Sequence, residues 1–316
     1  MFLVTLHQEL LSPARACPAT GRLSSCDPNL QTVPRGVETC LGVDFNFRAL
    51  FVPARPHTKL VAIDYSQMEI RVLALFCRDP HLQKVLQQRS GDLYLLLSSM
   101  FLKKDVESVT AQERTQTKTL ALGIIYGMGA AELARRLQIS VSQAARLRKN
   151  FLGTFPGIAN FMRVAVQRAR KCGYVKTVLG RKRSVPDINN SNKRLKAMAE
   201  RQSVNSVIQG SAADVMKVAL IRLRAMFSTW QASHPCLPAP RILLQLHDEV
   251  LLEVTDTEPH FHSLVRSLIH CLETDVPESV FASMGGTVDS VPFRVSVKEG
   301  KDWGNMRDIT LSIQKH

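Results

Sequence analysis

Two apolar segments that lie far apart in the chain each deliver carboxylates to the end of a predicted strand. The first, Lys59–Asp64, ends at Asp64; the second, residues 242–254, is an apolar hairpin sequence interrupted by Asp248 and Glu249. Apolar runs of this length predict buried strands. If the strands share one sheet, Asp64 and Asp248 can meet at one point, where hard cations such as Mg²⁺ find carboxylate ligands. The alternative is that both acids only solvate turns.

The composition predicts a globular protein with a polyanionic partner. Of 316 residues, 45% are hydrophobic and 22% charged, and 41 Lys and Arg against 27 Asp and Glu give a net charge of +14. A surplus of this size favours nucleic acid as the partner. No segment has the ~18 apolar residues of a membrane span, and the first residues lack the basic region of a secretory signal, which predicts an intracellular protein. The seven cysteines are widely spaced, form no CxxC pair and are predicted to be reduced thiols.

A helix is predicted from a capping box that begins at Thr110 to about Tyr126. It carries Arg114, Lys118 and Leu122 at a spacing of four residues, so these side chains and Tyr126 follow one slowly turning stripe. Arg114 and Lys118 can neutralise a triphosphate, and Lys118 could also donate a proton to the leaving pyrophosphate. The ring of Tyr126 can offer a flat surface to a base. The alternative is a basic exposed face with Tyr126 packed in the core.

A second polar stripe lies on a long helix predicted over residues 194–227, before a loop predicted over residues 228–240. Arg201, Asn205 and Gln209 repeat the spacing of four residues on this helix. Hydrogen-bond donors on one face suit the minor groove of DNA, because every Watson–Crick pair presents an acceptor there. Such donors test the geometry of a base pair without reading its sequence. The alternative is a solvated polar face.

In their order, these segments resemble the family A DNA polymerases, the group of bacterial DNA polymerase I. The resemblance extends from about Thr20 to Trp303. Within this resemblance, the sequences of Val33–Glu38 and Arg48–Pro53 are most similar to the eukaryotic theta branch of the family. The matching blocks are Thr20–Ser25 with Pro28–Gln31, Asp64–Arg71 (motif A), Arg114, Lys118 and Tyr126 with Gly127 (motif B), Gly173–Val175 with Gly180 and Arg181, Ala199–Asp214, and Gln245–Glu249 (motif C).

The resemblance implies an α+β fold, with the palm of a right-hand polymerase, an antiparallel sheet with helices, and a helical fingers lobe. Residues 1–74 would form the first palm segment, 75–190 the fingers and 191–316 the second palm segment, with the thumb absent. The implied reaction is template-directed addition of a dNTP to a primer 3′-hydroxyl by a two-metal mechanism with two Mg²⁺ ions, in DNA repair or replication. The theta branch implies a location in the nucleus, with an organelle as the alternative.

The resemblance also assigns site residues. Asp64 and Asp248 would bind the metal ions together with the carbonyl of Tyr65, and Glu249 and Lys118 would complete the catalytic set. Glu69 would block a ribose 2′-hydroxyl. The implied dNTP-binding residues are Tyr65, Gln67, Glu69, Arg114, Lys118, Leu122 and Tyr126, and the implied DNA-binding residues are Arg22, Arg201, Asn205, Gln209 and His247.

Two positions depart from the family pattern. Leu122 stands where an aromatic ring normally packs on the nucleotide sugar, and Tyr94 stands where bacterial members carry histidine near the triphosphate. Because the chain begins at the family's first palm segment, one alternative function is a catalytically impaired, thumbless fragment that binds primer-template without extending it. The other is a DNA-binding regulator, because residues 132–146 resemble a helix-turn-helix. A regulator would have no use for metal-binding acids, so metal-dependent activity distinguishes the two classes.

Overall fold

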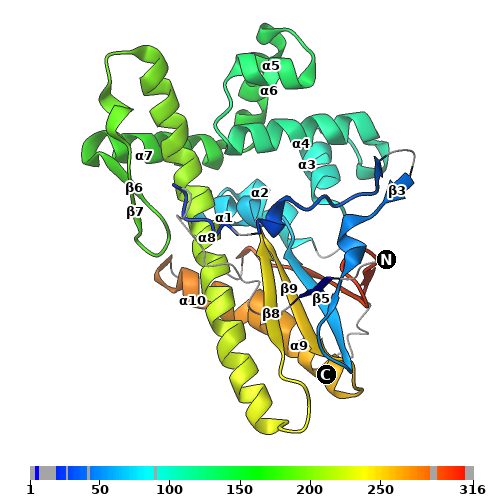
Figure 1. The fold of residues 1–316 in the computed structure, drawn as a ribbon. Helices are drawn as coiled ribbons and strands as arrows, with labels where there is room; N and C mark the ends of the chain where they lie inside the picture. Colours follow the sequence, from blue (N-terminus) through cyan, green and yellow to red (C-terminus); the bar gives the residue numbers. More distant parts are fainter. Residues whose placement is uncertain are drawn as a thin grey trace. The chain divides into compact units, whose positions relative to one another are not determined.

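The computed structural model describes residues 4–6, 19–25, 28–40, 43–88, 91–284 and 290–309. The chain divides into two compact units, and Figure 1 traces their elements in chain order. Unit 1 comprises residues 1–66, 215–279 and 293–316, and unit 2 comprises residues 67–214 and 280–292. One boundary between the units falls within the long helix α8 (Lys193–Ser233).

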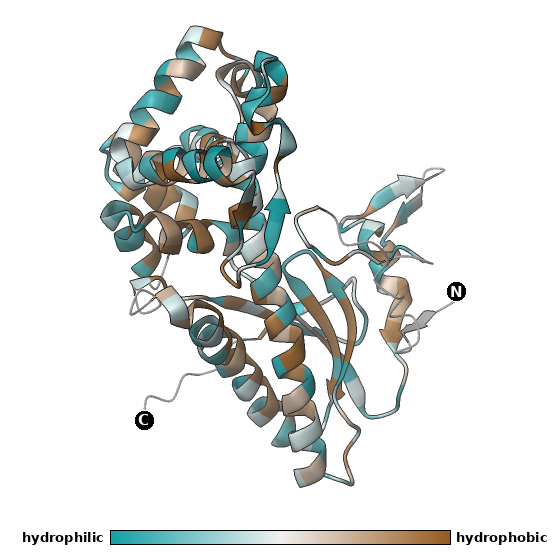
Figure 2. Cartoon of the chain, turned by 90° about the vertical axis from the view of Figure 1, so that its left-hand side faces the viewer, coloured by the Kyte–Doolittle hydropathy of each residue, from teal (hydrophilic) through white to brown (hydrophobic). Residues whose placement is uncertain are grey.

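Unit 1 is built on a five-stranded antiparallel sheet. The strand order is β11-β10-β5-β9-β8, so the strand that carries Asp64 is central. Leu60, Leu251 and Trp303 are buried in a core on this sheet, and hydrophobic residues colour much of its strands in Figure 2. The predicted hairpin and the predicted strand at 59–64 are confirmed. The strands are β5 (Thr58–Tyr65), β8 (Arg241–Leu246), β9 (Glu249–Thr255), β10 (Val295–Gly300) and β11 (Arg307–Asp308).

Short elements and the helix α9 (His260–His270) complete unit 1. α9 contacts β9 and lies beside the C-terminal half of α8 (Figure 1). The described part of the N-terminal region has only short strands and single 3₁₀ turns, as its turn-rich sequence predicts. These elements are β1 (Val4–Leu6), η2 (Leu30–Thr32), β2 (Glu38–Cys40), β3 (Val43–Phe45), η3 (Phe47–Leu50) and β4 (Phe51–Pro53), and a π-helical turn η6 (Cys271–Asp275) leads into α10 (Val276–Phe281).

Unit 2 is predominantly helical, as predicted. Thr110 and Ser140 each begin a helix with a complete capping box, in which the side chain at the third helical position returns a hydrogen bond. Pro156 occupies the first turn of its helix, where a missing N–H is tolerated. The elements are α1 (Met68–Cys77), α2 (Pro80–Gln87), α3 (Leu93–Leu102), η4 (Val106–Ser108), α4 (Ala111–Ile125), α5 (Ala130–Leu137), α6 (Val141–Thr154), α7 (Pro156–Cys172), β6 (Tyr174–Lys176), β7 (Lys182–Ser184), η5 (Pro186–Asn189) and the N-terminal part of α8.

The helix α8 is longer than the sequence predicts. We expected a loop from Ser228, but the helix continues to Ser233. The hydroxyl groups in these last turns bond back to the helix, since Ser228 donates to the carbonyl of Arg224 and Ser233 to the carbonyl of Thr229. The helix ends where Pro235 disfavours helical backbone at the preceding residue.

Among the described residues, no helix has the length and apolar character needed to cross a membrane. Cys77, Cys172, Cys236 and Cys271 are free thiols. Cys17 and Cys26 lie outside the described residues, and so does the side chain of Cys40.

Candidate active site

The predicted acidic residues meet at one end of the sheet in unit 1. Asp64, near the end of β5, pairs directly with Glu249, the first residue of β9. The backbone N–H of Tyr65 donates to the carbonyl of Asp248 over 3.0 Å, which ties the end of β5 to the hairpin turn. In that two-residue turn His247 has a φ of 52°, a left-handed conformation that suits a tight hairpin. Strand pairing therefore brings together acids separated by most of the chain.

An arginine that the sequence did not single out neutralises part of this acidic group. Arg35 Nη2 donates to Glu249 Oε2 over 3.2 Å, whereas Glu249 Oε1 is buried with no hydrogen-bond partner in the described part of the chain. Burial raises the pKa of Asp64, and the neighbouring Glu249 raises it further, while Arg35 lowers it. Arg48 anchors the segment that carries Arg35, since its guanidinium donates to the carbonyls of Val33 and Pro34. No local spacing marks Arg35, because its partner lies 214 residues away.

These residues fit a divalent metal ion. The described residues contain no group of three or more His, Cys, Asp or Glu side chains arranged as a metal cage. Mg²⁺ needs only one or two carboxylates, because water and substrate phosphate complete its coordination. Asp64, and Asp248 in the hairpin turn next to Glu249, supply hard oxygen ligands of this kind, and the buried Glu249 oxygen without a partner adds negative charge beside them.

A second group of predicted residues lies on α4 in unit 2. Arg114 forms a two-hydrogen-bond ion pair with Asp92, at 3.0 Å from Nε to Oδ1 and 2.6 Å from Nη2 to Oδ2. Lys118 is exposed, and its Nζ lies 5.3 Å from the ring centre of Tyr94. Burial raises the pKa of Tyr94 to about 12, so its hydroxyl stays protonated at neutral pH. The two cations of the predicted stripe therefore share one aromatic platform.

The C-terminal end of α4 packs closely on α8, also within unit 2. Gly127 has a φ of 70°, and a Cβ there would lie 3.0 Å from Cβ of Arg201. Only glycine suits this backbone at this spacing. Tyr126, half-buried beside Gly127, is thus adjacent to the start of the α8 stripe. On that stripe Oδ1 of Asn205 is buried with no hydrogen-bond partner among the described residues.

The remaining predicted site residues differ in burial and in the element that carries them. Glu69 is buried in the first turn of α1, and Leu122 is half-buried on α4. Gln67 is exposed with a left-handed backbone, where it begins α1. Among the predicted DNA-binding residues, Arg201 and His247 are exposed, whereas Arg22, Asn205 and Gln209 are half-buried. The acids belong to unit 1, and the stripes on α4 and on α8 belong to unit 2.

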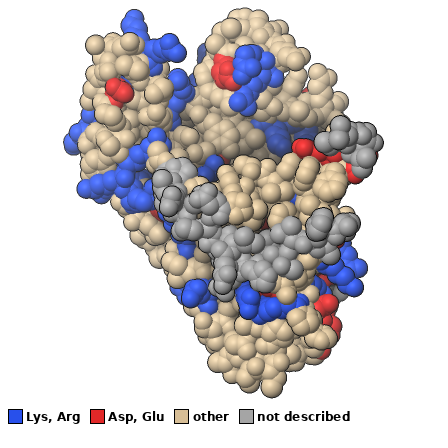
Figure 3. Space-filling model, viewed as in Figure 1, with Lys and Arg blue, Asp and Glu red and all other residues tan. Residues whose placement is uncertain are grey.

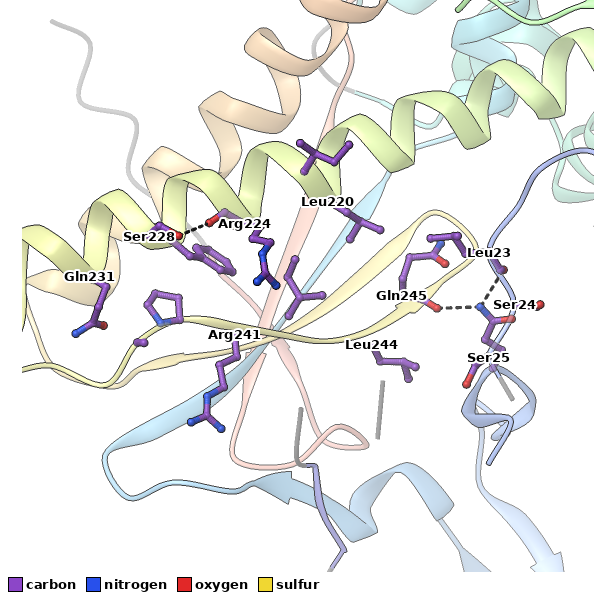
Figure 4. Close-up of a pocket in the computed structure, with 16 residues that line it drawn as sticks. Leu23, Ser24, Ser25, Leu220, Arg224, Ser228, Gln231, Arg241, Leu244 and Gln245 are labelled. Carbon is purple, nitrogen blue, oxygen red and sulfur yellow. Dashed lines mark hydrogen bonds between the residues drawn. The ribbon is translucent and has the colours of Figure 1, made fainter. Parts of the chain in front are cut away.

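A cavity of about 800 Å³ lies elsewhere in unit 1 (Figure 4). The C-terminal half of α8, strand β8 and the segment around Leu23 line it. Gln31 Nε2 joins that segment to β8, donating to the carbonyls of Leu23 and Gln245 over 3.3 and 2.9 Å. The cavity contains none of the predicted site residues. Lys and Arg side chains form several clusters on the face drawn in Figure 3, in keeping with the net charge of +14.

An antiparallel sheet with acids at its end, together with a helical unit that carries a basic stripe, is the arrangement of a right-hand polymerase domain. The family model of DNA polymerase family A matches residues 10–305. The chain belongs to this family.

Relatives and a solved structure agree with this family. DNA polymerase I of Mycobacterium tuberculosis (strain ATCC 25618 / H37Rv) is 36% identical over 286 residues, which cover 90% of this chain and 29% of the relative. DNA polymerase I of Geobacillus stearothermophilus is 38% identical over 244 residues, covering 77% of this chain and 27% of the relative. The structure of the POL domain of Pol1 from M. smegmatis, in complex with DNA primer-template and dNTP, matches with a TM-score of 0.76 and 34% identity, over 91% of this chain and 46% of that chain. The chain thus spans less than a third of the length of these curated relatives.

The comparisons confirm the predicted α+β polymerase fold and contradict one prediction. A nuclear location is wrong, because the relatives are DNA polymerase I enzymes of bacteria, which have no nucleus. The nuclear prediction depended on the similarity of residues 33–38 and 48–53 to the theta branch, and that similarity stays a prediction. The family match sets the regulator alternative aside, although residues 132–146 do form two helices joined by a short turn.

Proposed function

We propose that this chain is the palm-and-fingers region of a DNA-directed DNA polymerase, which adds dNTPs to a primer 3′-hydroxyl in DNA repair or replication. The palm would comprise residues 1–74 and 191–316, and the fingers residues 75–190. The observation that carries the proposal is the direct pairing of Asp64 with Glu249 beside Asp248, at the end of the sheet. The M. smegmatis domain, whose structure holds primer-template and dNTP, supports the same substrates.

Asp64 and Asp248, with the carbonyl of Tyr65, would hold divalent metal ions, which we propose to be Mg²⁺. Bound Mg²⁺ supplies Lewis acidity that lowers the pKa of an attacking hydroxyl and stabilises developing negative charge. Glu249 would support these ligands through its ion pair with Arg35, because the guanidinium reduces the repulsion between the neighbouring carboxylates. The primer 3′-hydroxyl releases its proton to water, and its oxygen forms a new bond to the α-phosphate of the dNTP as the bond to pyrophosphate breaks.

The stripe on α4 would bind the nucleotide. Arg114 and Lys118 pair with the triphosphate, and Lys118 donates a proton to the leaving pyrophosphate. Leu122 contacts the sugar, and Tyr126 stacks at the template base. Glu69, buried at the start of α1, excludes a 2′-hydroxyl, and we propose that Gln67 and Tyr65 also bind the nucleotide.

The stripe on α8 would contact duplex DNA. Arg201, Asn205 and Gln209 donate to the acceptors that all base pairs present in the minor groove. The buried, unpartnered oxygen of Asn205 favours an external partner for this side chain. Arg22 and His247 would contact the primer terminus. Together these contacts sense pair geometry without selecting a sequence.

A primer-extension assay with Mg²⁺ and four dNTPs tests the proposal. The expected result is template-directed extension by the parent chain, its loss in Asp64→Asn, and its retention in Glu132→Gln, which removes an exposed carboxylate outside the proposed site. A mobility-shift assay with the same DNA distinguishes an active polymerase from the second candidate function, a fragment that binds primer-template without extending it. Tight DNA binding without extension by the parent chain would favour the catalytically impaired fragment, in which Leu122 weakens the grip on the nucleotide.

A further inference from the structure

Asp92 binds Arg114 by only one of the two edges that a guanidinium offers. A guanidinium can meet an oxyanion through its Nε and one terminal nitrogen, or through its two terminal nitrogens. Asp92 takes the first edge, with hydrogen bonds from Nε and Nη2. Nη1 of Arg114 has no hydrogen-bond partner within the described residues, so the second edge remains open.

Asp92 is itself held rigidly. It is the N-cap of α3, and its Oδ1 accepts the backbone N–H groups of Tyr94 and Leu95 over 2.9 and 3.0 Å. The hydrogen bond from Arg114, above all, lowers the pKa of Asp92, and the backbone N–H groups lower it further. The carboxylate is therefore ionised at neutral pH, and its position is fixed by the first turn of a helix rather than by a flexible side chain.

The ring of Tyr94 lies beneath both cations. The guanidinium carbon of Arg114 is 6.0 Å from the ring centre, and Nζ of Lys118 is 5.3 Å from it. Tyr94 as a residue is only 7% exposed, so packing restricts its ring. Asp92 and Tyr94 together restrict the conformation of the Arg114 side chain. The terminal nitrogens of Arg114 and the exposed Lys118 stay available to an anion.

We propose that Asp92 is a positioning residue for nucleotide binding, which orients Arg114 so that its open edge receives a phosphate of the incoming triphosphate. The inference rests on the proposed function, because it assigns a partner to a residue of the proposed nucleotide site. An arginine side chain has many rotamers, and one held in its binding geometry loses less entropy when the phosphate arrives. Asp92 acts through Arg114 and does not touch the nucleotide.

Asp92→Asn tests the inference, because asparagine keeps the N-cap and removes the charge that holds the guanidinium. We expect KM for a single dNTP to rise about fivefold, the factor that an exposed ion pair contributes, with kcat and primer-template affinity unchanged. Glu132→Gln is the matched control, since it removes the carboxylate from another Arg pair in unit 2 and should leave KM unchanged. In an Arg114→Ala background, Asp92→Asn should have no further effect.

Three outcomes would overturn the inference. An unchanged KM would mean that Arg114 needs no positioning. A lower KM would mean that Asp92 repels or competes with the phosphate. A rise that persists without Arg114 would mean that the substitution acts through α3, which thermal unfolding of the variant would reveal. If the parent chain does not extend primers, that result contradicts the proposed function and not this inference. Equilibrium dialysis then measures the dissociation constant of a dNTP for the parent chain and for Asp92→Asn, and the inference requires it to be about fivefold higher in the variant.

Discussion

Asp64 on β5 lies directly opposite Glu249 on β9, so two carboxylates occupy neighbouring positions on the same face of the sheet. Burial raises the pKa of Asp64, and repulsion between these like charges raises it further. The ion pair from Arg35 offsets part of the repulsion on one side only, since the second oxygen of Glu249 has no partner in the described part of the chain. The geometry is typical of a site that needs an external cation.

Asp64→Asn and Asp248→Asn should each lower primer extension about a thousandfold or more. Each substitution removes charge that the proposed metal ions need, and metal-assisted charge stabilisation is worth several kcal/mol. Glu249→Gln should be milder, because this residue supports the site through Arg35. Single-turnover extension and DNA affinity measure the effects. Equal residual activity in all three variants would contradict the assignment, as would a loss of DNA binding that matches the loss of activity.

Glu69→Ala should raise ribonucleotide incorporation relative to the parent chain. The side chain is buried at the start of α1, so its removal opens space where the proposed site excludes a 2′-hydroxyl. The measurement is the ratio of incorporation rates for dNTP and rNTP. Glu107→Ala, which changes a carboxylate in an exposed 3₁₀ turn, is the control. Unchanged sugar selection in Glu69→Ala would remove this residue from the nucleotide site.

Leu122→Phe should lower KM for dNTP by up to about tenfold, which corresponds to about 1.4 kcal/mol. A flat ring offers more contact to the sugar than leucine does. Leu122→Tyr should also make dideoxynucleotides better terminators, because its hydroxyl can replace the interaction of the missing 3′-hydroxyl. Gln112→Phe, on the first turn of the same helix, controls for added surface. If neither aromatic residue changes KM or the ddNTP ratio, Leu122 does not face the sugar.

Binding to primer-template should fall steeply as salt rises and should depend little on sequence. With a net charge of +14, phosphate neutralisation and the release of counterions dominate the affinity. Fluorescence anisotropy with two unrelated duplex sequences between 50 and 200 mM salt, roughly the range over which such binding collapses, measures both properties. A flat salt dependence, or a strong preference for one duplex, would argue against non-specific backbone binding.

Gly157→Ala should destabilise unit 2 by about 1–3 kcal/mol, the usual cost of overpacking. A Cβ at Gly157 would lie 2.8 Å from Cβ of Asp79 and 2.8 Å from the carbonyl oxygen of Cys77. Gly153→Ala is the matched control, because nothing lies within 4 Å of its Cβ position, and it should stabilise α6 by about 0.5–1 kcal/mol. Urea denaturation measures both variants. Equal stability of the two would show that α7 can shift away from Asp79.

The sequence alone predicted the elements whose signals are local. The apolar run ending at Asp64, the hairpin around Asp248 and the capping box at Thr110 each depend on neighbouring residues, and each was confirmed in place. The ordered blocks from Thr20 to Trp303 also identified the polymerase family. The end of α8 was missed because the small polar residues and prolines of residues 228–240 predict a loop, whereas contacts such as the stacking of Trp230 on His234 accompany the longer helix.

Only the tertiary structure decided which distant residues became partners. The role of Arg35 could not be predicted from the sequence, because its partner Glu249 lies 214 residues away and no local spacing links the two residues. Asp92 caps α3, and its hydrogen bonds with Arg114 depend on how α3 packs against α4. The physical reason is that secondary structure follows from hydrogen bonds and apolar spacing within a few residues, whereas charge pairing follows from the path of the whole chain through the core.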